Sequence, residues 1–338
     1  MRNKRKISIA IIIFIIFILL IINASVKNKP TRMLQGPIEG CDSILTIGNN
    51  LCVISKNNHV YTWDWKNFRK WPLVAKPQTS AITPFSGDKV VFARENLILT
   101  DLKAEKEAGS LSLPYGYEVQ KINVSPNGKA GVILLSQKDN YKIAVFDSNF
   151  KNLSVVFEKN TTEENCTLFD IAINDEGNLI CVVGKKDKGW IFIKDIKNDK
   201  IILEKTFDEY GQFTIVKFSP DNKNIYLAEK IRFIICLDSN TGNVLRIYEM
   251  PVYNTPANQK QNISAIAISP DGKIFAADTE PACTVWYWNI STGEKVMEFR
   301  ANDFTVSDIA FSPDSKFLAT GCLVRPEIKI WKVPQLKE

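Results

Sequence analysis

The sequence predicts an all-β fold built from seven copies of one unit of about 38–50 residues, and three observations predict it. A hairpin turn of the Ser-Pro-Asp-Gly-Lys type recurs along the chain. An apolar run follows each hairpin, and six of the seven runs end in Asp or Asn. A further apolar segment follows in the clearest units, which gives four strands in each. Such repeats are typical of a seven-bladed β-propeller with four-stranded blades.

The first predicted element is an N-terminal transmembrane or signal helix. Residues 1–6 form a basic head, and residues 7–22 are uncharged and almost all Ile, Leu or Phe. Basic residues before an apolar run mark the cytoplasmic side, so residues 7–24 are predicted to anchor the chain and residues 25–31 to form a linker. Cleavage after Ala24 would secrete the protein instead. We favour the anchor, because the run is long and ends without a clear small-x-small site.

A hairpin opens each repeated unit. The turns begin near Gly48, Ser86, Ser125, Asn174, Ser219, Ser269 and Ser312. Pro presets φ in such a turn, Asp or Asn caps it locally, and Gly adopts positive φ.

The third strand of each unit carries the second signature. These strands are predicted at residues 59–64, 97–101, 142–147, 190–195, 233–238, 285–289 and 328–332. Six of them end in a side chain that can accept N–H groups of the next turn: Asp64, Asp101, Asp147, Asp195, Asp238 and Asn289. Fourth strands follow, as at residues 243–250 and 294–300.

The seventh unit supplies only three strands, and its missing outer strand has to come from elsewhere or leave an exposed edge. Residues 31–38 resemble the fourth strands of the other units. We therefore expect this segment to pair with residues 327–333 and close the ring, so that the propeller spans residues 32–338.

The hairpins and third-strand endings resemble the WD-repeat family over residues 32–338. One ending is a literal Trp-Asp pair, at Trp63 and Asp64. The Gly-His dipeptide of the family is absent from every unit, so the resemblance is to a divergent member without the His–Asp network. Because most members of the family are interaction platforms, the resemblance implies a protein partner and no chemistry of its own.

The composition excludes several classes of function. Seven of the 43 basic residues precede Met33 with no acid among them, which leaves 36 positive against 37 negative charges in the rest. This near-neutral body argues against nucleic-acid binding. With His59 as the single histidine, no poly-His metal site can form. Common catalytic and cofactor-binding motifs are absent, so the sequence predicts no catalytic residue, no cofactor and no metal.

Several residue types have a structural and a functional interpretation. The seven cysteines favour buried core thiols, because four of them lie in apolar strand-like runs. Trp63, Trp65, Phe68 and Trp71 could form a shelf for a ligand, but packing between blades is the better interpretation. His59, at the start of a strand, is expected to be structural or solvated rather than catalytic.

The loops between the second and third strands are the candidate partner-binding face. Six of the seven carry Lys or Arg, and a local ring of cations can steer an acidic partner. The candidate residues are Lys56, Arg94, Lys138, Lys185, Lys186, Lys188, Lys230, Arg232 and Arg325. Acids in the same loops weaken the positive field. Lysine is also abundant in the chain, so the alternative interpretation is that these cations are ordinary solvated loop residues without a binding role.

The sequence therefore predicts a membrane-tethered propeller on the extracytoplasmic side that acts as a protein-interaction scaffold. One alternative is an extracytoplasmic module that binds a glycan or another anionic polymer. The other is a propeller enzyme of the lactonase, lyase or quinoprotein type, which would place acids, metal ligands or a cofactor clamp on the axis.

Overall fold

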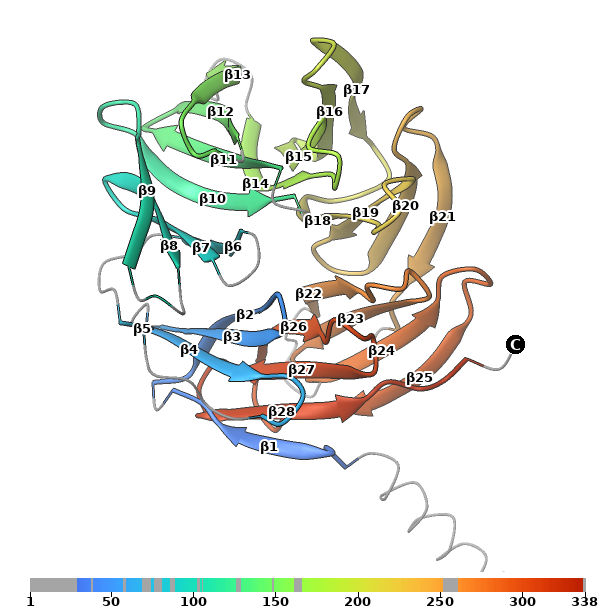
Figure 1. Cartoon of the computed structure of the whole chain (residues 1–338). Coiled ribbons are helices and arrows are strands. Elements are labelled where there is room, and N and C mark those ends of the chain that lie inside the picture. Colours follow the sequence, from blue (N-terminus) through green and yellow to red (C-terminus); the bar gives the residue numbers. More distant parts are fainter. Residues whose placement is uncertain are drawn as a thin grey trace, which may run out of the picture.

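The computed structural model describes residues 29–336, apart from residues 38, 57–58, 69–73, 76–80, 86–88, 102–103, 105, 126–128, 148, 161–165 and 252–260. Over this part of the chain, seven four-stranded antiparallel sheets stand around a central axis (Figure 1). The predicted seven-bladed β-propeller is confirmed. The predicted basic head and N-terminal helix lie outside the described residues, and within those residues no helix has the length and apolar character to cross a membrane.

The first four blades follow one another along the chain. Blade 1 contains β2 (Cys41–Ile47), β3 (Asn50–Ser55), β4 (His59–Asp64) and β5 (Val74–Ala75). Blade 2 contains β6 (Ala81–Pro84), β7 (Lys89–Ala93), β8 (Asn96–Asp101) and β9 (Lys106–Ser112). Blade 3 contains β10 (Glu118–Val124), β11 (Ala130–Gln137), β12 (Asn140–Asp147) and β13 (Leu153–Asn160). Blade 4 contains β14 (Cys166–Ile173), β15 (Leu179–Lys186), β16 (Lys188–Asp195) and β17 (Lys200–Phe207).

Three further blades complete the ring. Blade 5 contains β18 (Phe213–Phe218), β19 (Asn224–Glu229), β20 (Phe233–Asp238) and β21 (Val244–Glu249). Blade 6 contains β22 (Asn262–Ile268), β23 (Ile274–Glu280), β24 (Thr284–Asn289) and β25 (Lys295–Arg300). Blade 7 contains β26 (Val306–Phe311), β27 (Phe317–Cys322), β28 (Glu327–Lys332) and β1 (Arg32–Gln35).

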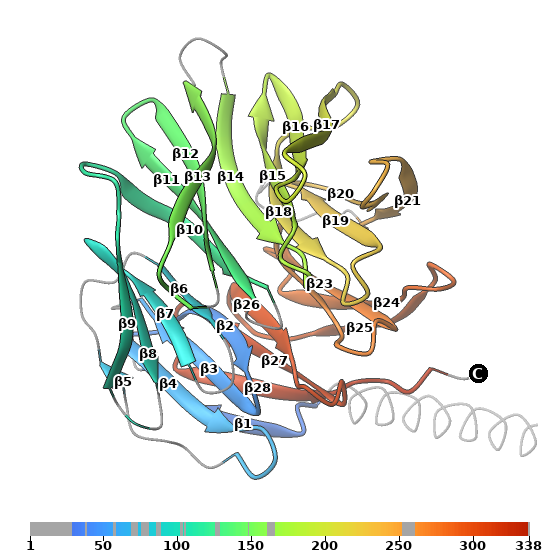
Figure 2. The same ribbon diagram turned by 45° about the horizontal axis from the view of Figure 1, so that its top comes forward.

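Strand direction divides the propeller into two faces. We name the strands of each blade a to d from the central channel outward. Because neighbouring strands are antiparallel, the a–b and c–d turns lie at one end of the blades, here called the a–b face. The b–c turns and the connections to the next blade lie at the other end, here called the b–c face (Figure 2).

The inner strands share a register shift opposite strand b, which occurs in six of the seven blades. It lies between Cys41 and Ser43, Val119 and Lys121, Leu168 and Asp170, Phe213 and Ile215, Ile263 and Ala265, and Val306 and Ile309. Such a β-bulge bends a strand and increases its twist, so the inner strands of these six blades curve along the channel wall.

Each pair of neighbouring blades encloses an apolar cluster, and together these seven clusters form the core. Aromatic rings fill several of them. Phe299 lies 4.3 Å from Trp331 between blades 6 and 7, and Tyr226 lies 5.5 Å from Phe275 between blades 5 and 6, measured between ring centres. Because every blade buries both of its faces, removing one blade would expose two of these clusters to water.

The a–b turns are held by their own side chains. In blade 5 the Ser219 hydroxyl donates to Asp221 Oδ1 at 2.6 Å and accepts the N–H of Asn224 at 2.9 Å. The same two contacts recur in the turns that begin at Ser269 and Ser312. These turns confirm the hairpin chemistry predicted from the sequence.

Positive φ in the a–b turns is not confined to glycine. Gly272 has φ of 69°, but Asn222 and Ser315 adopt 61° and 59° at the matching positions. Their side chains reach the neighbouring blade: Asn222 Oδ1 accepts the N–H of Asp175 at 2.7 Å, and Ser315 Oγ accepts the N–H of Asp271 at 3.1 Å. These two residues therefore link neighbouring blades at the a–b face.

The c–d turns confirm the second signature. All six predicted side chains accept at least one N–H of the next turn at 2.7–3.0 Å: Asp64, Asp101, Asp147, Asp195, Asp238 and Asn289. The N–H of Lys151 lowers the pKa of Asp147, and the hydroxyl and N–H of Thr241 lower the pKa of Asp238. Both carboxylates therefore stay ionised while they hold their turns.

The last blade takes its outer strand from the other end of the propeller sequence. Strand β1 pairs antiparallel with β28, with Arg32 opposite Ile330 and Gln35 opposite Glu327. Outside the ladder, the Thr31 N–H donates to the carbonyl of Ile330 at 2.7 Å. The paired segment is shorter than residues 31–38. It covers the edge that β28 would otherwise expose.

Strand β1 also adds a side chain to the core between blades 7 and 1. Leu34 is 9% exposed and joins the cluster that contains Ile328 and Trp63, whereas Met33 next to it is 55% exposed. We predict that Leu34→Ala lowers the free energy of unfolding by about 2–3 kcal/mol, as truncation of a buried leucine does. Urea denaturation of the full chain measures this effect.

The matched control is Met33→Ala on the same strand, for which the expected change is within about 0.5 kcal/mol. Equal effects of the two substitutions would contradict a packed closing strand.

Candidate functional site

The candidate site is the b–c face, where the structure places all nine cations chosen from the sequence. Six lie in b–c turns, Lys185 and Lys186 end β15, and Lys188 begins β16. Blades 1, 2, 3, 4, 5 and 7 thus each present at least one cation at the same end of the propeller. The structure brings these residues to one face, spread around the ring rather than gathered in one pocket.

Seven of the nine side chains are exposed, and Arg94 and Lys186 are partly buried. Two of the exposed arginines have neighbours in the structure. Arg232 forms an ion pair with Glu249 of its own blade. The Arg325 guanidinium lies 4.8 Å from the centre of the Phe304 ring, within cation–π range. The five exposed lysines are Lys56, Lys138, Lys185, Lys188 and Lys230.

The acids of the b–c turns differ in what they do. Glu95, Asp139 and Asp187 are exposed and weaken the positive field locally. Glu229 is only 4% exposed, and its carboxylate accepts the N–H groups of Ile231 and Arg232 at 2.9 and 2.7 Å. This acid therefore shapes the turn that presents Lys230 and Arg232.

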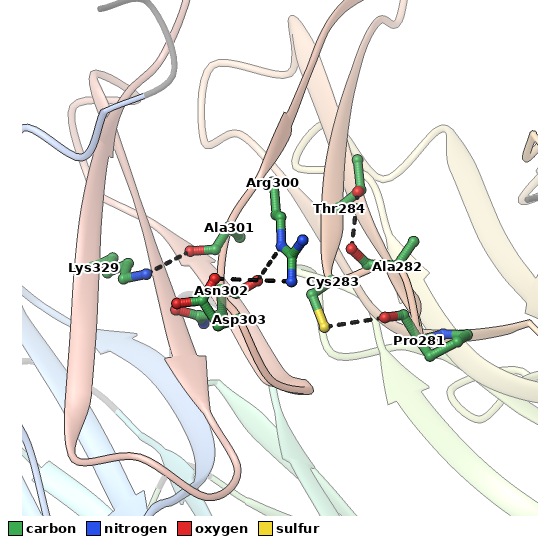
Figure 3. Close-up of polar contacts among 9 residues, drawn as sticks. All are labelled: Pro281, Ala282, Cys283, Thr284, Arg300, Ala301, Asn302, Asp303 and Lys329. Carbon is green, nitrogen blue, oxygen red and sulfur yellow. Dashed lines mark hydrogen bonds and ion pairs between the residues drawn. The ribbon is translucent and has the colours of Figure 1, made fainter. Parts of the chain in front are cut away.

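Blade 6 contributes no cation from its b–c turn, but Arg300 lies beside that turn (Figure 3). Its Nε donates to the carbonyl of Asn302 at 3.1 Å, and its Nη2 lies 3.8 Å from Asp303 Oδ1. Lys329 Nζ donates to the carbonyl of Ala301 at 3.1 Å. These two cations fasten the connection between blades 6 and 7, which sequence reasoning had not assigned to them.

A cavity of about 500 Å³ lies inside the ring of inner strands. All seven blades line it, and it contains charged residues of both signs: Asp42, Lys121, Asp170, Lys217 and Asp308. Convergent polar groups in a cavity are a common feature of ligand sites. The hydrogen bonds of these groups show whether they hold the blades together or are available to a ligand.

Two of the channel carboxylates hold neighbouring blades together. Asp308 Oδ2 accepts the hydroxyl of Ser43 at 2.8 Å and the N–H of Ile44 at 3.0 Å. Asp170 Oδ2 accepts the N–H of Val216 at 2.9 Å. Burial raises the pKa of Asp308, and the charge of Lys217 opposes this shift. Both carboxylates thus satisfy N–H groups next to the bulge of the following blade.

Cysteine thiols and clusters of metal-ligating side chains are two possible sources of chemistry within the described part of the chain. All seven cysteines are buried free thiols, as predicted, and burial raises the pKa of Cys283 to about 11. Among the described residues, no group of three or more His, Cys, Asp or Glu side chains could hold a metal ion.

The aromatic residues and the histidine have structural surroundings. Trp63 and Trp65 are buried, and Phe68 packs edge-on against Trp65 and Phe317. Trp71 lies outside the described residues. His59 Nδ1 lies 3.3 Å from Glu39 Oε1, so both predictions of a structural role agree with these contacts.

One buried carboxyl has an incomplete set of partners. Asp278 in β23 is 0% exposed, and its Oδ2 accepts the hydroxyl of Ser264 at 2.5 Å. Its Oδ1 has no hydrogen-bond partner among the described residues. The pKa of Asp278 is raised to about 8, chiefly by burial and also by the charge of Glu280, while the hydrogen bond from Ser264 opposes the rise. Asp278 is therefore mostly protonated at neutral pH.

The sequence contained signals for these acids that its motifs did not use. Asp170 and Asp308 both precede Ile-Ala, within LFDIAI and VSDIAF of two inner strands. Asp278 is an acid inside the otherwise apolar run IFAAD. An acid at a repeated position of an inner strand, or inside an apolar strand, marks a group with a specific buried partner.

Comparison with known proteins agrees with this architecture. The family model "WD domain, G-beta repeat" matches residues 293–332. The β-propeller domain of Cps50 (Swd1) from Myceliophteria thermophila has a TM-score of 0.73 at 16% identity, covering 91% of this chain and all of that one. A chain of the hydrazine synthase of Kuenenia stuttgartiensis has a TM-score of 0.70 at 14% identity, covering 89% and 97%. At these identities the likeness shows the fold.

Curated relatives match parts of the chain. Periodic tryptophan protein 2 homolog of Dictyostelium discoideum is 26% identical over 39% of this chain and 14% of its own length. Autophagy-related protein 18 of Kluyveromyces marxianus is 28% identical over 28% and 20%. WD repeat domain phosphoinositide-interacting protein 1 of Xenopus laevis is 26% identical over 51% and 38%. The chain thus spans less than two fifths of each of these relatives, and the matches support a propeller of the WD-repeat type.

Asp278 makes the stability of the propeller depend on pH. Its pKa is raised in the folded chain, so the folded state loses stability as pH rises from about 4 towards 8. We predict that Asp278→Asn, which keeps an acceptor for Ser264, removes a slope of up to about 1.4 kcal/mol per pH unit. Urea denaturation at pH 5, 6, 7 and 8 measures it.

Asp303→Asn is the control, because it removes a carboxylate whose side chain is 83% exposed. The pH dependence of this variant should match that of the unsubstituted chain. An unchanged slope in Asp278→Asn would show that Asp278 is ionised in the folded protein throughout this range.

Proposed function

We propose that this protein is a membrane-tethered, extracytoplasmic scaffold whose b–c face binds an acidic protein partner. The observation that carries the proposal is the set of exposed cations that blades 1, 3, 4, 5 and 7 present at one end of the propeller. A positive surface attracts an acidic partner over a distance and steers it towards the productive orientation during encounter.

The contrast with the opposite face supports this assignment. At the a–b face, the Asp and Ser side chains of the turns are engaged in hydrogen bonds that hold the turns and link the blades. At the b–c face, the five exposed lysines lie in or next to the b–c turns, and the buried Glu229 shapes the turn that carries Lys230. Loops that a rigid scaffold holds in place are common binding surfaces.

The tether follows from residues 1–24. A basic head before an uncharged run of 16 residues favours a membrane anchor with the following domain outside the cytoplasm. One of the relatives named above, WD repeat domain phosphoinositide-interacting protein 1, is a WD-repeat protein by name, which adds support for an interaction role. Binding without catalysis also fits a channel whose acids Asp170 and Asp308 hold blades together.

A second candidate is a module for an anionic polymer outside the cell, favoured by the same cations. The phosphates, sulfates or carboxylates of such a polymer would contact the cations along the ring. The affinity of the propeller for the polymer would fall steeply as the salt concentration rises. Binding of the purified full chain to a polymer in the absence of any protein would favour this candidate.

Charge reversal on one face tests the proposed function. The variant carries Lys138→Glu, Lys185→Glu, Lys188→Glu and Lys230→Glu, all at exposed positions of blades 3, 4 and 5. Arg232 is left unchanged, because its pairing with Glu249 would turn into a repulsion. Proximity labelling from the anchored full chain should lose its acidic partner, with labelling reduced to the level of a chain without the propeller.

The matched control reverses four exposed lysines of the same blades on the a–b face: Lys151, Lys197, Lys200 and Lys223. The change in net charge is identical, so partner labelling should be retained. Partner labelling that survives the b–c variant at low salt, or that is lost equally in both variants, would contradict binding at the b–c face.

A further inference from the structure

The direction of β1 fixes where the chain enters the propeller. Strand β28 follows a b–c turn, so its first residue, Glu327, lies towards the b–c face. Because Gln35 pairs with Glu327 and Arg32 pairs with Ile330, β1 begins at the a–b face and runs towards the b–c face. The N–H of Gly36 donates to the carbonyl of Pro326 in that b–c turn, which fixes the far end of the strand.

Contacts of Arg32 confirm that the entry point belongs to the a–b face. Its Nη1 donates to the carbonyl of Asn67 at 3.3 Å, and its guanidinium lies 4.7 Å from the centre of the Phe68 ring. Asn67 and Phe68 belong to the c–d turn of blade 1 that Asp64 holds. The chain therefore reaches the propeller at its rim, beside blades 7 and 1 (Figure 2).

Cations gather around this entry point. Lys29 and Arg32 lie on the incoming chain, Lys66 lies in the c–d turn of blade 1, Lys316 lies in the a–b turn of blade 7, and Lys332 ends β28 at the same face. All five side chains are exposed. Asp314 lies 3.6 Å from Lys316 and offsets part of this charge. Positive charge of this kind complements the phosphate groups at the surface of a bilayer.

The linker is too short to let the propeller turn over freely. Residues 25–31 span at most about 25 Å when fully extended. The blades are about 20–25 Å tall, since their longer strands contain six to eight residues. A chain that leaves the membrane at residue 24 thus meets the a–b face first and can barely reach past it.

We propose that the a–b face near blades 7 and 1 rests against the bilayer surface, so that the b–c face points away from the membrane. This inference rests on the tether of the proposed function. It assigns the two faces separate tasks: the a–b face, with its entry point and five cations, docks on phosphate headgroups. The b–c face is left accessible to a partner from solution or from a neighbouring surface.

Fluorescence quenching by lipids tests this orientation in the full chain. Because all seven native cysteines are buried, a maleimide dye labels an added surface cysteine selectively in the folded protein. Lys316→Cys places the dye at the a–b face of blade 7, and Arg325→Cys places it at the b–c face of the same blade. Both proteins are reconstituted in phosphatidylcholine and phosphatidylglycerol vesicles that contain a nitroxide-headgroup lipid.

The expected result is loss of most of the fluorescence at residue 316 and its retention at residue 325, because nitroxides quench only at short range. Equal quenching at both positions, or stronger quenching at residue 325, would overturn the orientation while leaving the tether intact. Failure of the chain to remain with carbonate-washed vesicles would instead overturn the tether, and the orientation with it. Sedimentation of the same samples separates these two failures.

Discussion

The pairing of β1 with β28 is the interaction on which the rest of the propeller depends. Six blades are built from consecutive strands, and the seventh takes its outer strand from residues 32–35. Without this strand, β28 would expose an unpaired edge, and the cluster between blades 7 and 1 would lose Leu34. Because each blade packs against two others, a weak seventh blade weakens both of its neighbours, so a short ladder supports the whole ring.

Closure also determines how the two faces of the propeller differ. The direction of β1 brings the incoming chain to the a–b face, and the same antiparallel alternation places the nine candidate cations at the opposite face. Hydrogen bonds of Ser, Asp and Asn side chains hold the a–b face together. The b–c turns and the strand ends next to them carry exposed lysines. One strand thus couples the stability of the ring to the orientation of its candidate binding surface.

Local repeats made most of the fold predictable. The Ser-Pro-Asp-Gly-Lys turns and the Asp or Asn at third-strand ends act through contacts within a few residues, so Ser219 and Asp238 were assigned correctly from sequence. The roles of Asp170, Asp308 and Asp278 depend on atoms far away in the chain, and no local pattern specifies such partners. The same holds for Asn222 and Ser315, whose side chains reach the preceding blade. The placement of the nine cations on one face could be predicted from the antiparallel order of the strands in each blade alone.

Hydrogen–deuterium exchange of the full chain in its membrane tests the central claim that β1 closes the ring and fixes the entry at the a–b face. Amides of an integral blade exchange only when the larger structure opens. The peptide covering residues 327–332 should therefore exchange as slowly as those from β20 and β24, and the peptide covering residues 32–35 as slowly as those from the outer strands β21 and β25, in step with them as denaturant is added. Fast exchange of residues 32–35, with protection retained in the other blades, would contradict closure by β1.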